Sequence, residues 1–115
     1  MFDTGTFTLH GGQESQWKIE CDALTEADWK TLAAMIAERQ TFSDVEGVPS
    51  GGWSLADALV AYRSPEGPLL IVDDVLTTGV SMETQRADRE AVGYVVFARG
   101  PCPPWVQALF TLDAK

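Results

Sequence analysis

The stretch "LLIVDDVLTTGVS", Leu69–Ser81, joins an apolar run, two adjacent carboxylates and a Thr-Thr-Gly turn. An unbroken apolar run is typical of a strand that is covered on both faces. Asp73 and Asp74 are therefore predicted to end a buried strand, and residues 77–79 are predicted to lead into a helix. The stretch places carboxylate acceptors and backbone donors side by side at one end of a strand.

This combination predicts a ligand with both hydroxyl groups and an anionic group. Carboxylates at a strand's carboxyl end can accept hydrogen bonds from ligand hydroxyls, as acidic residues do with ribose. The N–H groups of a turn that opens a helix can hold an anion, and Gly79 permits the positive φ that such a turn needs. A sugar phosphate satisfies both halves. The alternative is that Asp73 and Asp74 are turn and capping residues without a ligand.

The flanking sequence alternates strand and helix patterns. Apolar strand patterns separated by helical spacing predict parallel pairing, an α/β class and a small, mostly parallel sheet flanked by helices. In such sheets ligands bind beyond the carboxyl ends of the strands. The expected order from Phe42 onward is a weak strand to Gly47, a "PSGG" turn, a helix carrying Leu55, Ala58, Leu59 and Tyr62, the 69–72 strand, a polar helix over 80–89, the strand "VGYVVFA" and an edge strand "QALFTL".

A longer helix precedes this unit. Thr25 with Asp28 matches a capping box, and the helix is expected to run to about Gln40. Its buried stripe is predicted to contain Trp29, Leu32, Ala33 and Ile36. Further upstream, "FTLH" and the alternating "WKIEC" predict a β segment at the N-terminus.

Composition limits the possible partners. The chain has 115 residues, 45% of them hydrophobic, and a formal net charge of −9, which predicts a single domain over 1–115. The acidic balance argues against nucleic acid and against anionic membrane surfaces. No apolar run is long enough to span a bilayer, and the N-terminus has no secretory pattern. Cys21 and Cys102 fit no metal spacing, so free thiols and a cytoplasmic location are expected, with no protein metal site.

The opening stretch resembles the phosphoribosyl pyrophosphate (PRPP) binding motif of type I phosphoribosyltransferases: an apolar run, two acidic residues, then Thr-Thr-Gly. The resemblance implies that fold and implies that Asp73 and Asp74 contact the ribose hydroxyls and act in catalysis. It also implies that the loop from Val75 to Ser81 holds the 5′-phosphate. The loop residues implied in substrate binding are Val75, Thr77, Thr78, Gly79, Val80 and Ser81.

Within that family the chain is most similar to orotate phosphoribosyltransferases. "FTLHGGQESQWKIECDAL" resembles their N-terminal segment and implies a reduced hood, with His10 at a position that contacts substrate in some members. "GVPSGGWSLADAL" resembles their pyrophosphate loop, which implies binding roles for Pro49, Ser50, Gly51 and Gly52. "YVVFARG" resembles their next strand, which ends in an orotate-contacting Arg, here Arg99.

The implied reaction moves phosphoribose from PRPP to a nucleobase, with orotate favoured, as in pyrimidine nucleotide synthesis or salvage. The resemblance further implies Mg²⁺ carried by the pyrophosphate, small-molecule substrates and a possible homodimer. One departure is large: only Arg63–Pro68 replace the long Lys-bearing loop of the orotate enzymes. A non-catalytic PRPP or nucleotide-binding module, acting as a sensor or regulatory subunit, is therefore the alternative.

Single residues admit two interpretations each. Arg63 is either a replacement cation or, more simply, a solvated connector residue. Arg86 and Arg89 are expected on a wet helix face. Trp53 is expected in the core, with stacking on a base or ribose as the alternative.

Overall fold

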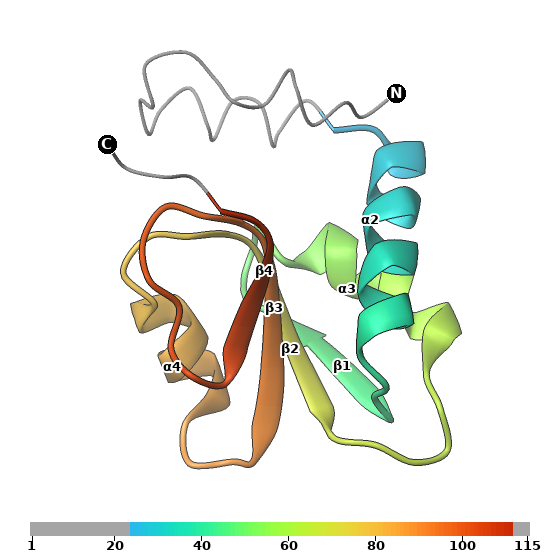
Figure 1. Ribbon diagram of the computed structural model, residues 1–115. Coiled ribbons are helices and arrows are strands. Elements are labelled where there is room, and N and C mark those ends of the chain that lie inside the picture. Colours follow the sequence, from blue (N-terminus) through green and yellow to red (C-terminus); the bar gives the residue numbers. More distant parts are fainter. Residues whose placement is uncertain (1–23, 112–115) are drawn as a thin grey trace.

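The computed structural model describes residues 24–111 (Figure 1). The β segments predicted within residues 7–21, and His10 and Cys21 with them, lie outside the described residues. The described elements alternate as the sequence predicts. In chain order they are α2 (Glu26–Arg39), β1 (Asp44–Gly47), α3 (Trp53–Leu59), the 3₁₀ turn η3 (Val60–Tyr62), β2 (Leu69–Leu76), α4 (Val80–Arg86), β3 (Ala91–Ala98) and β4 (Val106–Thr111).

The four strands form one sheet in the order β1-β2-β3-β4. Every pairing is parallel: Gly47 is opposite Val72, Val72 is opposite Tyr94, and Tyr94 is opposite Gln107. Consecutive parallel neighbours require a crossover between them, and α3 and α4 supply the first two. The α/β class with a small parallel sheet flanked by helices is confirmed.

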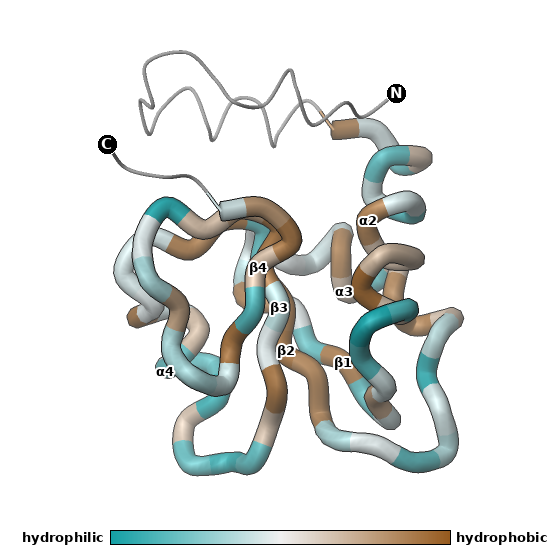
Figure 2. Tube along the Cα trace, in the orientation of Figure 1, coloured by the Kyte–Doolittle hydropathy of each residue, from teal (hydrophilic) through white to brown (hydrophobic). Residues whose placement is uncertain are grey.

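Helices cover the two faces of the sheet unequally. In Figure 1, α2 and α3 lie on one face and α4 on the other. The α2/α3 face holds the larger apolar cluster, which includes Leu32, Leu59 and Val72. The α4 face holds a smaller cluster around Ile71, Met82 and Val95. Figure 2 shows the corresponding apolar colouring along β2 and β3, in contrast to the hydrophilic turns at the lower end of the sheet.

Helix α2 begins and ends close to its predicted bounds. Thr25 Oγ1 accepts from the N–H of Asp28, and an Asp28 carboxylate oxygen accepts from the N–H of Thr25, so the capping box is present. The predicted stripe is buried at Leu32, Ala33 and Ile36, whereas Trp29 is only partly buried against the core. None of the described helices is long and apolar enough to cross a bilayer.

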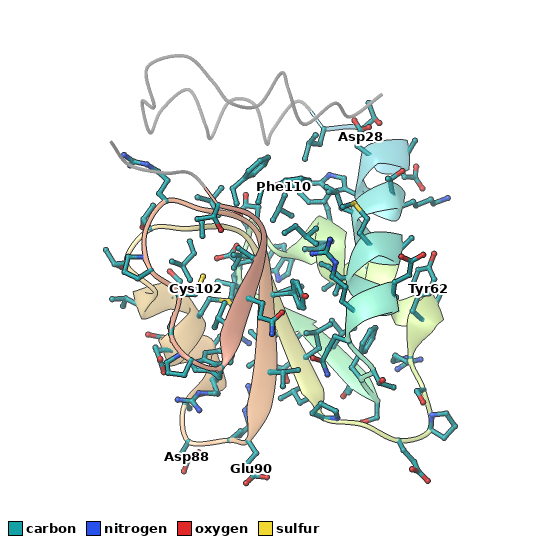
Figure 3. All side chains as sticks on the ribbon, viewed as in Figure 1. Asp28, Tyr62, Asp88, Glu90, Cys102 and Phe110 are labelled. Atoms are coloured by element: carbon teal, nitrogen blue, oxygen red, sulfur yellow. The ribbon has the colours of Figure 1, made fainter. Side chains whose placement is uncertain are left out.

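Three predictions about single elements need correction. Trp53 is 59% exposed, because it precedes the buried pair Leu55 and Leu59 by about half a helical turn and so faces outward. The helix expected to carry Tyr62 ends at Leu59, and Tyr62 lies in the 3₁₀ turn η3, where it is exposed (Figure 3). The polar helix expected over 80–89 ends at Arg86, where Ala87 takes a positive φ of 56°.

Candidate functional site

The acidic pair lies inside β2 and not after it. Asp73 pairs with Val95, and the ladder to β3 continues through Val75 to Leu76. The sequence suggested an earlier end because Asp disfavours strands, but the neighbouring strand β3 offers partners as far as Ala98. Strand β1 ends at Gly47, opposite Val72, so Asp73 and Asp74 extend beyond the end of β1.

Strand β2 also changes its side-chain alternation at the acidic pair. Leu70 and Val72 belong to the α2/α3 cluster, and Ile71 belongs to the α4 cluster. With strict alternation, Leu76 would lie on the α2/α3 face like Leu70 and Val72, and Val75 would lie on the α4 face. Instead, Leu76 belongs to the α4 cluster and Val75 packs against the α2/α3 cluster. The backbone therefore shifts phase across Asp73 and Asp74.

Both carboxylates are nearly buried, and each accepts a hydrogen bond from the backbone of β2. Asp73 is 7% and Asp74 9% exposed. Asp73 Oδ1 accepts from the N–H of Asp74 at 2.8 Å, and Asp74 Oδ1 accepts from the N–H of Val75 at 2.7 Å. The second oxygen of Asp74, Oδ2, accepts no hydrogen bond within residues 24–111, so it remains available to a ligand hydroxyl.

The loop over residues 49–52 meets Asp74 directly. A Cβ atom added at Gly51 would lie 2.7 Å from Oδ2 and 2.8 Å from Oδ1 of Asp74, so the glycine backbone abuts the carboxylate. The loop is anchored where β1 ends, because the N–H of Val48 donates to Val72 O at 2.9 Å and the N–H of Gly52 donates to Val48 O at 2.8 Å. The peptide bond between Pro49 and Ser50 is cis. The fold thus brings together the two sequence motifs that were predicted to share one edge.

The loop over residues 77–79 presents backbone donors at the same edge. Gly79 has a φ of 87°, as predicted, and Thr77 and Thr78 are exposed. The N–H of Val80 donates to Thr78 Oγ1 at 3.3 Å, while the N–H groups of residues 77–79 donate to no acceptor in the described part of the chain. Helix α4 has only seven residues, so these amides matter more for an anion than the helix dipole does.

An open cleft of ≈ 530 Å³ lies between residues 48–49 and helix α4. Its walls combine apolar and hydroxyl-bearing side chains, and Val80 at the rim is 64% exposed. The lining residues are Val48 and Pro49 on one wall and Val80, Ser81, Thr84 and Gln85 on the other. Predicted residues from both motifs therefore line one cavity.

Positive charge is less concentrated here than the resemblance implies. The backbone of Arg99 lies at the carboxyl end of the sheet, since the backbone N–H of Arg99 donates to Leu76 O at 2.9 Å. Arg63 is exposed in the connector that enters the amino end of β2, at the opposite edge of the sheet (Figure 1). Of its two interpretations, the solvated connector residue agrees with this position.

The sequence predicts Arg86 and Arg89 on a wet helix face, but in the structure both guanidinium groups bind carboxylates. Arg89 donates to both carboxylate oxygens of Glu46 at 2.8 Å, and Gln85 donates to the same carboxylate at 3.0 Å. These contacts lower the pKa of Glu46 to about 2, with Arg89 the largest cause. Arg86 donates to Glu83 at 3.0 Å and lies over the Trp105 ring. Both guanidinium groups therefore serve as anchors for α4.

The acidic pair provides oxygen ligands of the kind that Mg²⁺ prefers. Residues 24–111 contain no group of three or more metal-ligating side chains. Mg²⁺ is commonly held by one or two carboxylates together with substrate phosphates, and Asp73 and Asp74 provide such oxygen donors at the ligand edge. The residues present therefore fit a magnesium ion held jointly with a phosphate-bearing ligand.

Comparison with solved structures finds chains of similar structure. No family model and no curated protein matches the chain. The structure is similar to that of Helicobacter pylori xanthine-guanine-hypoxanthine phosphoribosyltransferase, with 13% sequence identity, a TM-score of 0.46, and coverage of 87% of this chain and 84% of that one.

Sequence reasoning missed the side chains that hold α4. Glu46 alternates with the inward-facing Val45 on β1, so its position on the α4 face was readable from strand period. Its partner Arg89 was not readable, because the pair is 43 residues apart and meets only after β1 and β2 have paired. Cys102 is a free thiol, as predicted, on the α4 side (Figure 3), and burial raises its pKa.

Proposed function

We propose that this chain binds PRPP at the carboxyl edge of its sheet and transfers phosphoribose to a nucleobase, with orotate the first acceptor to test. The observation that carries the proposal is the contact between Gly51 and the Asp74 carboxylate. It joins the 49–52 loop to the acidic pair, next to a loop whose backbone N–H groups donate to no acceptor within residues 24–111. Hydroxyl acceptors lie between two loops suited to phosphate groups, and PRPP carries groups of both kinds.

Each region has a distinct role in the proposal. The carboxylate of Asp74, with Asp73, accepts hydrogen bonds from the ribose hydroxyls and stabilises positive charge that develops on the sugar as the pyrophosphate leaves. The amides of residues 77–79 hold the 5′-phosphate, and the 49–52 loop lies against the pyrophosphate. No covalent nucleophile is required. Arg99, at the end of β3, is the residue proposed to contact the base.

A second candidate is a binding module without turnover. The six-residue connector from Arg63 to Pro68 enters the opposite edge of the sheet, and Arg86 and Arg89 are engaged in ion pairs. A site with little cationic charge near the leaving pyrophosphate favours ligand binding over catalysis. In this form the protein would act as a sensor or a regulatory subunit.

Calorimetry with PRPP, with and without Mg²⁺, tests the shared part of both candidates. The variant Asp74→Asn removes the charge that strengthens hydrogen bonds to the ribose, so PRPP affinity should fall about 30-fold, which corresponds to about 2 kcal/mol. The matched control is Asp88→Asn, the same chemical change in the turn at the opposite end of the sheet (Figure 3). It should leave the affinity unchanged.

The result that contradicts the proposal is tighter PRPP binding by Asp74→Asn. That result would mean that the carboxylate only repels the anion and accepts nothing from the sugar. Transfer of labelled phosphoribose to orotate, with release of pyrophosphate, then separates the enzyme from the binding module. Binding without release of pyrophosphate for any base tested would favour the module.

A further inference from the structure

The segment from Arg99 to Trp105 runs alongside the 77–79 loop and contacts it repeatedly. The N–H of Arg99 donates to Leu76 O at 2.9 Å, directly before the loop. A Cβ atom added at Gly100 would lie 3.1 Å from the carbonyl oxygen of Thr77. The ring of Pro103 lies 3.5 Å from the Cβ position of Gly79, the residue with positive φ. The segment therefore lies against the loop at its two ends, Thr77 and Gly79.

Trp105 attaches this segment to the sheet. Its carbonyl oxygen accepts from the N–H of Gly93 on β3 at 2.8 Å. A Cβ atom added at Gly93 would lie 2.9 Å from Cζ3 of the Trp105 ring and 2.8 Å from Cε of Met82. The indole therefore occupies the space that the missing side chain of Gly93 leaves, between β3 and α4.

The nitrogen of the same indole forms a hydrogen bond with the Glu83 carboxylate on α4. Trp105 Nε1 donates to Glu83 Oε2 at 3.0 Å, and Arg86 donates to Glu83 Oε1 at 3.0 Å. The Arg86 guanidinium carbon lies 4.6 Å from the centroid of the Trp105 ring. Glu83 is in the first turn of α4, so an unpaired carboxylate there would repel an anion held by the loop. Here both of its oxygens are engaged.

We propose that Trp105 is a positioning residue for the 77–79 loop, acting through Glu83, and that it improves the binding of a phosphate monoester by that loop. The inference rests on the proposed function, since it concerns the same phosphate site. The indole performs two tasks: it packs between β3 and α4, and it holds one oxygen of the Glu83 carboxylate in a hydrogen bond.

The test measures binding of ribose 5-phosphate to the full chain by calorimetry. Trp105→Phe keeps an aromatic ring against Gly93 and Arg86 but removes the donor to Glu83. We expect affinity to fall about fivefold, the effect of one hydrogen bond to a charged group. Adding Glu83→Gln should restore the affinity to within about twofold, because the carboxylate left partly unpaired is then neutral. A residue that only stabilised the fold would not be rescued in this way.

Arg86→Gln provides an independent arm, because Arg86 is the second partner of Glu83. It removes the other partner of Glu83 and should weaken binding to a similar extent, again with rescue by Glu83→Gln. Arg39→Gln, the same change of charge in the last turn of α2, is the matched control and should leave affinity unchanged.

The outcomes separate the two proposals. The first outcome is that the wild-type chain binds ribose 5-phosphate and that Trp105→Phe and Arg86→Gln bind it as tightly, or lose affinity that Glu83→Gln does not restore. In that case the positioning role is wrong and the proposed function stands. If the wild-type chain binds neither ribose 5-phosphate nor PRPP, the proposed function is wrong and the positioning role falls with it.

Discussion

The two faces of the sheet are built differently. On the α2/α3 face, a large apolar cluster fills the space, with Leu32, Ile36, Leu55 and Leu59 fully buried. On the α4 face the apolar cluster is smaller, and the seven-residue helix is held in addition by side-chain hydrogen bonds from Gln85 to Glu46 on β1 and from Trp105 to Glu83. A helix of this length is not stable alone in water, so these contacts decide where α4 lies.

This difference separates stability from the candidate site. Apolar burial on the α2/α3 face supplies most of the driving force for folding. The directional polar contacts on the α4 face determine the position of the helix that follows the 77–79 loop. Substitutions on the first face should change the free energy of unfolding, and substitutions on the second should mainly change ligand binding.

The largest expected effect on stability comes from Leu59→Ala on the α2/α3 face. Leu59 is 0% exposed, so truncation leaves a cavity and should lower the free energy of unfolding by about 3 kcal/mol. Urea unfolding measures this loss. Affinity for ribose 5-phosphate, measured well below the melting temperature, should stay the same. A parallel loss of affinity in the folded variant would show that the two faces are not separable.

Gly79→Ala tests the loop itself. A residue with a side chain in the left-handed region costs about 1–2 kcal/mol, while the nearest atom to the added Cβ, on Pro103, lies at an ordinary contact distance of 3.5 Å. The strain should either lower stability by about 1 kcal/mol or be relieved by a shift of the loop that weakens phosphate binding. Paired denaturation and binding measurements distinguish these two responses. No change in either would contradict the loop conformation.

Glu46→Gln tests the attachment of α4 to β1. The folded state lowers the pKa of Glu46 from 4.5 to about 2, so its contribution is fully present above pH 4.5 and is lost as the pH falls toward 2. Because the pair is partly exposed, we expect the variant to lose only about 1 kcal/mol at pH 7. The difference from wild type should shrink at pH 3. A difference that grows on acidification would show that the carboxylate is not stabilised by Arg89.

Arg63→Ala should have the smallest effect. The side chain is exposed at the amino edge of the sheet, away from the acidic pair, and its Nε donates only a long hydrogen bond of 3.3 Å to Val60 O. Stability should change by less than about 0.5 kcal/mol, and PRPP affinity should not change. A clear loss of PRPP affinity would instead support the interpretation that Arg63 replaces the lysine of the missing long loop.

Local patterns predicted much of the architecture correctly. The capping box at Thr25, the end of β1 at Gly47 and the positive φ of Gly79 each follow from the side chain, or its absence, at one position. The parallel sheet follows from apolar strands separated by helical spacing. Trp53 was misassigned because its hydrophobicity was given more weight than its place on the helix.

The candidate site was predictable as a set of motifs but not as a geometry. The resemblance to the PRPP motif singled out residues 73–81, and the order of elements placed them with residues 49–52 at one edge. The extension of β2 through Asp74 was not predictable, because the partner strand β3 overrides the low strand preference of Asp.

By itself, the sequence determined the α/β class, the parallel sheet and the identity of the loops at its carboxyl edge, because helix and strand periods and glycine conformations are local properties. Only the tertiary structure decided that Gly51 abuts Asp74, that Glu46 binds Arg89 and that Trp105 lies over Gly93 against Glu83. These contacts join residues distant in sequence, and their geometry exists only after the sheet has paired and its two faces have been covered.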